Sequence, residues 1–413
     1  MTHKLFHDDV NIREFDANVL RCEPLDSDKS AKYESDKPLY AVWLDQTAFY
    51  AEAGGQTADH GTLGNANVLD VQEDETGDIY HVIDAQIAGC VHGALDWDRR
   101  FSNMQQHGGQ HLISWAVNKF LGGYTYGLHI GAQECTIDTD LKQIPSRQTL
   151  DMIEKEVNAL IWRDLPVHQW FPSDEELKTL PLRKKPTVSE NIRIVMTGDV
   201  ECVACCGTHP TSSGQIGLVT ILGAHPARGK TRISFLCGGR AYARLKAEAE
   251  ACREAGGMLS ATYETLAQET KRVLDDAREQ AHALVIFRRE ELMKALPELV
   301  KNARVLPSGI KLIAHRFDSA DRDGLIKAAS DLIANSQTVA LLAAGNAEGA
   351  GDIAVFACAD DVKMDMGRFM REAIKPYGGR GGGRGGFAQG GAPNALNAIA
   401  LSDAFITWSE AAQ

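Results

Sequence analysis

Short hydrophobic runs separated by glycines dominate residues 1–90 of the chain. The runs lie at residues 39–44, 66–71 and 79–83. Glycines at 54–55, 61 and 64 fall between them. Runs of this length, rich in β-branched and aromatic residues and bounded by glycine, are typical of β-strands joined by tight turns. The pattern therefore predicts a small β-barrel-like module.

Helical and strand patterns are mixed between residues 91 and 238. Residues 105–121 predict a helix, because apolar residues four apart share one face and the glycine pair at 122–123 provides a stop. A second helix is expected at residues 150–165. Strands are expected at residues 127–137, 192–196 and 232–236. This mixture indicates an α+β domain.

Residues 239–300 carry a mainly helical pattern. Apolar positions between residues 259 and 284 follow a three-four spacing, which forms one seam on a helix and predicts a helical hairpin or coiled coil. Gly256 and Gly257 are expected to turn the chain, and Pro297 is expected to help end the helical segment.

Apolar runs alternate with helical patterns from residue 301 to residue 413, which predicts a small α/β domain. Strands are expected at residues 311–314, 339–343 and 353–357, and helices at 323–333 and 364–374. A glycine-rich stretch at 378–391 contains Arg380 and Arg384. The composition of this stretch alone is typical of a linker. The flanking strand and helix patterns instead favour an ordered loop, whose backbone amides and guanidinium groups suit phosphate contacts.

The amino-acid composition of the chain limits the classes of protein to which it can belong. The chain has 413 residues, of which 44% are hydrophobic and 24% charged, as in a globular protein of several domains. Its formal net charge of −13 argues against a general nucleic-acid binder, although local basic clusters exist. No apolar run approaches the ~20 residues that cross a bilayer, and the N-terminus lacks the apolar core of a secretory signal. We expect a cytoplasmic protein without membrane contact.

The nine cysteines do not suggest a disulfide framework, because they are scattered and odd in number. Three of them crowd together at Cys202, Cys205 and Cys206, which favours a thiolate metal ligand.

Two distant segments together predict a metal site. His107 and His111 are four residues apart on the expected helix, so both imidazoles share one face. Cys205 and His209 add a thiolate and a third imidazole within a tight turn. Three nitrogens and one sulfur suit a tetrahedral ion, and zinc is the default. A zinc protease is disfavoured, since Gly108 stands where its helix needs a glutamate base.

Three motifs carry a specific family resemblance. They are Leu-Asp-Gln-Thr-Ala-Phe-Tyr-Ala-Glu-Ala-Gly-Gly-Gln at 44–56, Met-Gln-Gln-His-Gly-Gly-Gln-His-Leu at 104–112 and Cys-Cys-Gly-Thr-His at 205–209. Their order and spacing resemble the editing domains of alanyl-tRNA synthetases and the free-standing alanyl-tRNA editing proteins, the AlaX family. Residues 377–391 resemble the glycine/arginine/glutamine loop of the DHHA1 domain, found in the long AlaX proteins.

This resemblance implies a fold and an activity. It makes 91–238 a zinc-containing editing domain and 301–413 a DHHA1-like domain, with a β-rich module at 1–90 and a helical hairpin at 239–300. The family hydrolyses the ester of mischarged alanine tRNA, carrying serine or sometimes glycine. It acts in trans on tRNA charged elsewhere, so no ATP is required. The family's DHHA1-bearing members also imply a homodimer formed through the C-terminal half.

The resemblance also assigns residues. It places Zn²⁺ on His107, His111, Cys205 and His209. Thr47 and Gln56 become the polar groups of the pocket, because the glycine-rich motif faces the zinc in the family. The Thr47 hydroxyl would pair with the hydroxyl of serine, a group that alanine lacks. Arg380 and Arg384 become tRNA contacts.

Several alternatives stay open on the sequence alone. Cys205 keeps the family's spacing to His209, but Cys206 replaces a glycine common in the family and is the other candidate thiolate. Zinc could activate the attacking water or only position the substrate. A non-catalytic tRNA-binding zinc protein and a zinc hydrolase of another ester or amide are the competing functions.

Overall fold

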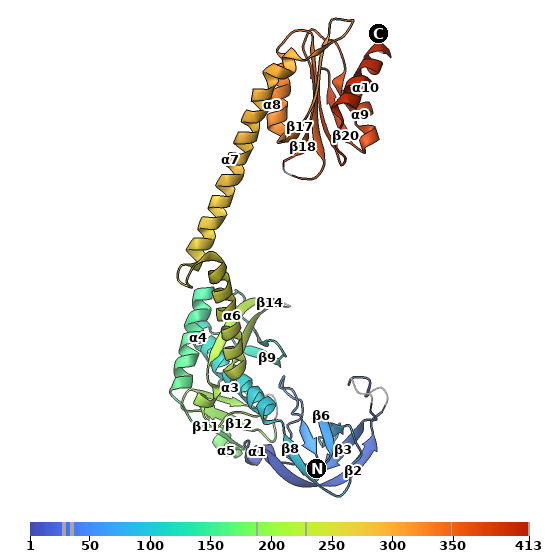
Figure 1. Ribbon diagram of the computed structural model, residues 1–413. Coiled ribbons are helices and arrows are strands. Elements are labelled where there is room, and N and C mark those ends of the chain that lie inside the picture. Colours follow the sequence, from blue (N-terminus) through green and yellow to red (C-terminus); the bar gives the residue numbers. More distant parts are fainter. Residues whose placement is uncertain (27–29, 34–36, 187–188, 228, 348, 412–413) are drawn as a thin grey trace. The chain divides into compact units, whose positions relative to one another are not determined.

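The computed structural model describes residues 1–26, 30–33, 37–186, 189–227, 229–347 and 349–411 (Figure 1). These residues form two compact units, Met1–Cys252 and Arg253–Gln413. Both units mix helices and strands, which confirms the expected α+β class. No helix in the described part of the chain has the length and apolar character needed to span a membrane.

The N-terminal part of the first unit is a closed six-stranded antiparallel barrel, as the short hydrophobic runs predicted. In barrel order its strands are β2 (Glu14–Pro24), β3 (Tyr40–Leu44), β7 (Ile79–Ile83), β6 (Ala66–Glu73), β5 (Gly61–Leu63) and β8 (Cys90–Leu95). Pairing of β8 with β2 closes the barrel. Val42, Leu44, Phe49 and Leu63 are completely buried inside it. A short parallel pair, β1 (His3–Lys4) and β4 (Gln46–Thr47), and the helix α1 (Leu5–Asp8) lie beside it.

The rest of the first unit packs two long helices against a four-stranded antiparallel sheet. The helices are α3 (Trp97–Leu121) and α4 (Arg147–Trp162), and the sheet order is β14 (Val219–Ala227), β15 (Lys230–Cys237), β10 (Cys135–Thr139) and β9 (Thr125–Ile130). A second sheet contains β11 (Val167–Trp170), β12 (Ile194–Thr197) and β13 (Glu201–Ala204), with α5 (Asp174–Leu177) and the 3-10 turn η1 (Ser213–Ile216) nearby in sequence. Leu112, Ile113 and Val117 of α3 meet Phe235 of β15 in the core.

The helical segment differs from the sequence expectation at two points. Helix α6 (Gly238–Leu259) runs through the expected turn, and the chain turns only after it, at Ser260. Gly256 permits that turn from within the helix, because a Cβ there would lie 2.6 Å from the Ala261 carbonyl oxygen. Helix α7 (Leu266–Lys301) likewise continues past Pro297. Burial of its last turns on the sheet, at residues such as Leu296, offsets the hydrogen bond that proline removes.

The second unit is a six-stranded sheet covered by helices on both faces. Its order is β16 (Arg304–Val305), β17 (Lys311–Ala320), β18 (Thr338–Asn346), β19 (Asp352–Cys358), β21 (Phe387–Ala392) and β20 (Arg380–Arg384). Val339, Leu341 and Ala343 of β18 pack with α9 (Met366–Ala373) and α10 (Ala398–Ala411). The alternate residues of β18 pack with α7 and α8 (Arg322–Ile333). A strand buried on both faces reads as one continuous apolar run, which explains why the sequence predicted it well.

The glycine-rich stretch is neither the linker that its composition suggested nor the ordered loop that its flanking patterns favoured. It forms β20 and β21, an antiparallel edge hairpin that follows the 3-10 turn η2 (Lys375–Tyr377). The glycines allow close packing: a Cβ on Gly367 of α9 would lie 2.1 Å from the Gly383 oxygen, and one on Gly383 would lie 2.0 Å from the Phe387 oxygen. The stretch is therefore a packed sheet edge, with Arg380 and Arg384 exposed on it.

Candidate metal centre and active site

Helix α3 supplies two imidazoles from its buried middle. Asp96 caps the helix by accepting a hydrogen bond from the Arg99 amide. His107 and His111 lie one turn apart and are only 4% and 5% exposed. The glycines between them allow the helix to pack closely, because a Cβ on Gly109 would lie 2.2 Å from the Cys237 sulfur. The motif thus combines two ligand side chains with a helix face that has no room for larger residues.

The turn after β13 supplies a thiol and a third imidazole. The Cys205 amide donates to the Arg193 carbonyl at 2.9 Å, which fixes the start of the turn. His209, at the end of the motif, is 1% exposed. Residue 207 between them must be glycine for steric reasons, because a Cβ there would lie 2.3 Å from Cε1 of His107. The turn can lie on α3 only with glycine at this position.

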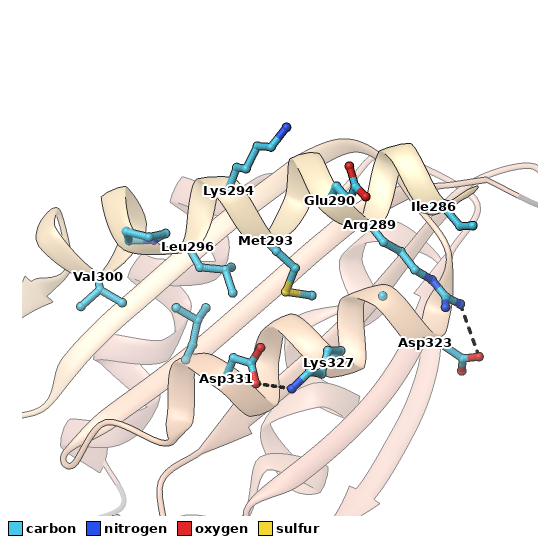
Figure 2. Close-up of a pocket in the computed structure, with 13 residues that line it drawn as sticks. Ile286, Arg289, Glu290, Met293, Lys294, Leu296, Val300, Asp323, Lys327 and Asp331 are labelled. Atoms are coloured by element: carbon cyan, nitrogen blue, oxygen red, sulfur yellow. Dashed lines mark hydrogen bonds and ion pairs between the residues drawn. The ribbon is translucent and has the colours of Figure 1, made fainter. Parts of the chain in front are cut away.

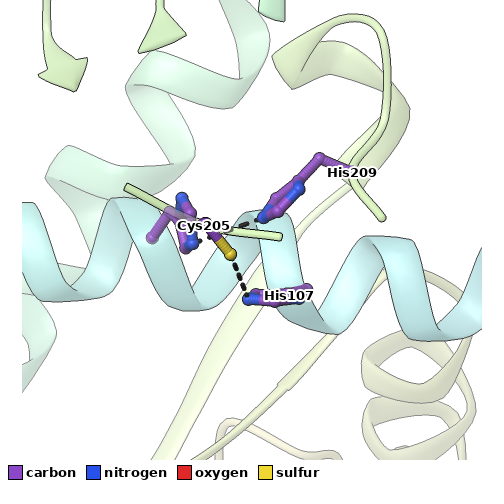
Figure 3. Close-up of side chains that lie close together, drawn as sticks. His107, Cys205 and His209 are labelled. Atoms are coloured by element: carbon purple, nitrogen blue, oxygen red, sulfur yellow. Dashed lines mark hydrogen bonds between the residues drawn. The ribbon is translucent and has the colours of Figure 1, made fainter. Parts of the chain in front are cut away.

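Four potential ligand atoms from these two segments converge. The Nε2 atoms of His111 and His209 are 3.3 Å apart, and Cys205 Sγ lies 3.4 Å from His107 Nε2 (Figure 3). No pair among the four ligand atoms is separated by more than 4.8 Å. A tetrahedral ion with nitrogen and sulfur ligands has edges of about 3.3–3.6 Å, given its bond lengths. The group therefore fits a metal ion, and it contains Cys205 rather than Cys206 or Cys202.

Hydrogen bonds behind two of the imidazoles aim their Nε2 atoms at the group. His107 Nδ1 donates to Gln56 Oε1 at 2.8 Å, and His209 Nδ1 donates to the Gly207 carbonyl at 3.1 Å. Each Nε2 is then the unprotonated nitrogen, as metal ligation requires. His111 Nδ1 is buried without a partner among the described residues. The arrangement directs the Nε2 lone pairs of His107 and His209 into the group, where a cation would bind them.

The electrostatic environment keeps the imidazoles neutral. Burial, with the Arg193 charge nearby, lowers the pKa of His107 to about 4. Burial also holds the pKa values of His111 and His209 well below their usual range. Burial raises the pKa of the Cys205 thiol to about 12. A thiolate therefore requires a bound cation here, which would stabilise it directly.

Gln56 connects the barrel to this group. It follows a tight turn in which Gly54 and Gly55 both have positive φ, at 61° and 87°. Gly55 must be glycine, because a Cβ would lie 1.8 Å from the Leu128 oxygen of β9. The Gln56 side chain is completely buried, donates to Thr208 Oγ1 at 2.8 Å and accepts from the Thr208 amide at 3.2 Å. The glycine-rich motif thus places one amide directly behind a ligand imidazole.

Thr47 lies elsewhere, in the interior of the barrel. Its hydroxyl is 2.8 Å from Nε2 of His81, whose Nδ1 donates to the Val42 carbonyl at 3.1 Å. The Thr47 hydroxyl is therefore the donor to His81, and its oxygen accepts from the Phe49 amide at 3.1 Å. None of the hydrogen bonds between described residues joins Thr47 to Gln56 or to the four converging side chains. Arg380 and Arg384 belong to the second unit.

Sequence reasoning missed Arg193, which is 1% exposed beside the group. Its guanidinium donates to the Gly207 carbonyl at 2.8 Å, the Cys205 carbonyl at 3.4 Å and Gln169 Oε1 at 2.8 Å. The Arg193 side chain binds the backbone carbonyl groups of the Cys-His turn, so no sequence motif indicated the role of Arg193. Thr208 could have been found, because it lies inside the Cys-Gly-Thr-His motif.

Comparisons with known proteins match the chain to two domain families and to full-length relatives. The DHHA1 domain matches residues 309–411, and the threonyl and alanyl tRNA synthetase second additional domain matches residues 192–234. The chain is 30% identical to alanyl-tRNA editing protein AlaX-L of Pyrococcus horikoshii, over 94% of both chains. It is 27% identical to alanyl-tRNA editing protein Aarsd1 of Danio rerio, over 92% of both. It is 32% identical to an alanine–tRNA ligase of Halorubrum lacusprofundi, matching 98% of this chain but 43% of the ligase.

Proposed function

The chain belongs to the alanyl-tRNA editing protein family, and we propose that it hydrolyses the ester of alanine tRNA that carries a wrong amino acid. Serine is the proposed main substrate residue and glycine the second. The observation that carries the proposal is the convergence of His107, His111, Cys205 and His209 within 4.8 Å, backed by the Gln56 amide of the glycine-rich motif. The relatives that match over nearly their whole length are named as editing proteins.

Zinc is the proposed ion, held by these three imidazoles and one thiolate. When bound, it would position the ester carbonyl and act as a weak Lewis acid. Gln56 keeps the His107 ring in the ligating tautomer. Oε1 of Gln56 already accepts two hydrogen bonds, and Nε2 donates one, so one amide hydrogen remains for a water molecule or an ester oxygen.

Selectivity is proposed to come from Thr47. Serine is larger than alanine, so a steric sieve cannot exclude alanyl-tRNA, and rejection requires a polar group that only serine satisfies. Because the Thr47 hydroxyl donates to His81 and accepts once, one lone pair remains to accept from a serine hydroxyl. Thr47 is completely buried, so the substrate would have to open a path to it.

We expect Thr47→Val to keep zinc and fold but to lose preference for the seryl substrate. One such hydrogen bond is worth roughly 1–3 kcal/mol, so discrimination should fall about ten-fold or more. The measurement is the ratio of deacylation rates on seryl-tRNA and alanyl-tRNA built on the same alanine tRNA. Thr47→Ser, which keeps the hydroxyl, is the control. An unchanged ratio in the valine variant places the discriminating group elsewhere.

A homodimer through the C-terminal half is proposed from the exposed apolar surface of α7. The Leu274 side chain is 53% exposed and the Phe287 side chain 57% exposed. Exposure of such apolar surface to water is unfavourable in free energy if the helix stays unpaired. A groove of about 820 Å³ between α7 and α8 adds Ile286, Met293 and Val300, with ion pairs such as Lys327–Asp331 along its rim (Figure 2). We also propose that the chain divides into four parts at residues 90, 238 and 300, and that residues 239–300 pair as a helical hairpin.

Light scattering at micromolar concentration is expected to give about twice the chain mass of 45.0 kDa. The variant Leu274→Lys/Phe287→Lys should shift the protein towards monomer, because each lysine would be desolvated at a buried interface. Ile399→Lys, at an exposed position on α10, is the matched control. A wild-type monomer under these conditions contradicts the dimer.

Arg380 and Arg384 are proposed to contact tRNA phosphates from the exposed sheet edge of the second unit. Neither forms an ion pair with a carboxylate in the part of the chain that the structure describes. Unpaired guanidinium groups are suited to phosphate, and such contacts position a nucleic acid without reading its sequence.

Three substrates separate the proposed activity from its alternatives. Serine release from mischarged alanine tRNA supports editing, whereas binding of that tRNA without release indicates a non-catalytic tRNA-binding protein. Turnover of a simple amino-acid ester at a comparable rate without tRNA indicates a general zinc hydrolase. Editing predicts release from tRNA and little turnover of the small ester, because remote binding energy is used to orient the reacting bond.

A further inference from the structure

A cleft of about 440 Å³ borders the metal group through Cys205. Its lining also includes Gly54 of the glycine-rich turn, Tyr126, Lys184 and Lys185. All of these residues belong to the first unit. The cleft therefore brings one ligand of the candidate metal centre together with an aromatic ring and two lysines.

The charges of this cleft oppose the charge of the chain. Its charged lining residues are Lys184, Lys185 and Arg193, whereas the whole chain has a formal net charge of −13. Within the described ranges, no carboxylate forms an ion pair with any of the three. Arg193 donates only to neutral oxygens, and its Nε is buried without a partner among those residues. Three unneutralised cations beside one another indicate an anionic ligand.

The cleft also presents an aromatic ring to that ligand. Tyr126 is 53% exposed on β9, the edge strand against which the glycine-rich turn packs. The ammonium groups of Lys184 and Lys230 lie over its ring, at 4.6 and 4.7 Å from the centroid. These contacts are held by flexible side chains, so a planar base can replace either lysine on the ring. The displaced ammonium then stays close enough to pair with a phosphate.

We propose that this cleft binds the single-stranded 3′ end of the tRNA, with a base stacked on Tyr126 and phosphates on Lys184 and Lys185. A phosphate-rich chain with unpaired bases is the ligand that needs both cations and an aromatic face. Its terminal ester then lies near Cys205, beside the metal group. This assignment rests on the proposed function and adds how the substrate is held.

Steady-state deacylation of seryl-tRNA tests the assignment. Tyr126→Ala should raise KM on the order of ten-fold with little change in kcat, whereas Tyr126→Phe, which keeps the ring, should match the wild type. Lys184→Gln/Lys185→Gln should raise KM and reduce the slope of log(kcat/KM) against log salt by about 1.4, or about 0.7 for each phosphate that is no longer neutralised. Lys119→Gln, which removes an exposed lysine paired with Glu156, is the control. Zinc content in each variant checks that the site is intact.

Competition by uncharged tRNA places the contact at the 3′ end. Removing the last nucleotides of the competitor should weaken inhibition of the wild type but should make little difference to the double lysine variant. Unchanged KM and salt slope in both variants, or a truncation penalty that persists in the lysine variant, overturns the assignment of the cleft. Failure of the wild-type protein to release serine overturns the proposed function instead, and direct binding of intact and truncated tRNA then tests the cleft.

Discussion

Cys205→Ala is expected to lose the bound zinc and to reduce deacylation on the order of 100-fold or more. Changes behind a metal ligand already cost roughly 10–100-fold in affinity or activity, and loss of the thiolate itself removes a direct bond. It also leaves three neutral, buried imidazoles with no anion to offset the charge of the ion. Elemental analysis of the purified protein should fall from about one zinc per chain to a small fraction of that value.

Cys206→Ala is the matched control for this prediction, because Cys206 is adjacent, exposed and outside the converging group. It should retain zinc. If Cys206→Ala loses the metal while Cys205→Ala keeps it, the thiolate ligand has been assigned to the wrong cysteine.

Arg100→Met is expected to destabilise the first unit by about 3–5 kcal/mol, the usual cost of leaving one partner of a buried ion pair alone. Arg100 and Asp59 form an ion pair, and both side chains are completely buried. Arg100 also donates to the Ala48 carbonyl at 2.5 Å and the Val10 carbonyl at 3.2 Å, so it connects α3 to the barrel. Its removal leaves the Asp59 carboxylate and these carbonyls without their cation.

Urea denaturation measures this loss against Lys119→Met, which breaks the exposed Lys119–Glu156 pair. That control should cost less than about 1 kcal/mol, because exposed ion pairs contribute little. The double variant Asp59→Leu/Arg100→Met should recover part of the stability, since no unpaired charge then remains buried. Equal stability of Arg100→Met and the control contradicts the structural role given to the pair.

The sequence predicted well those strands whose pattern of hydrophobic residues matches the faces that they bury. The runs at β3, β6 and β7 and the continuous apolar strand β18 correspond directly to the faces they bury. Local composition failed where tertiary packing decided the structure. Pro297 sits inside α7, where Leu292 and Leu296 on the turns before it are buried against the sheet. Gly381 and Gly383 of β20 leave room for the backbone of β21 rather than forming a loop.

In the candidate site too, local patterns predicted some features and tertiary packing decided the others. The four-residue spacing of His107 and His111 follows from helix geometry, so sequence alone could group them. Bringing them to Cys205 and His209, about a hundred residues later, depends on the fold of the whole unit. The Gln56–His107 bond and the buried Arg193 depend on side-chain packing between separate segments, which no local pattern encodes.

Deacylation of alanine tRNA charged with serine tests the editing assignment most directly. The wild-type protein, holding about one zinc per chain, should release serine many times faster than the spontaneous rate. It should leave the same tRNA charged with alanine largely intact. The Cys205→Ala variant should release serine near the spontaneous rate. Serine release at the spontaneous rate by the zinc-loaded wild type, or equal release of serine and alanine, would contradict a selective editing hydrolase.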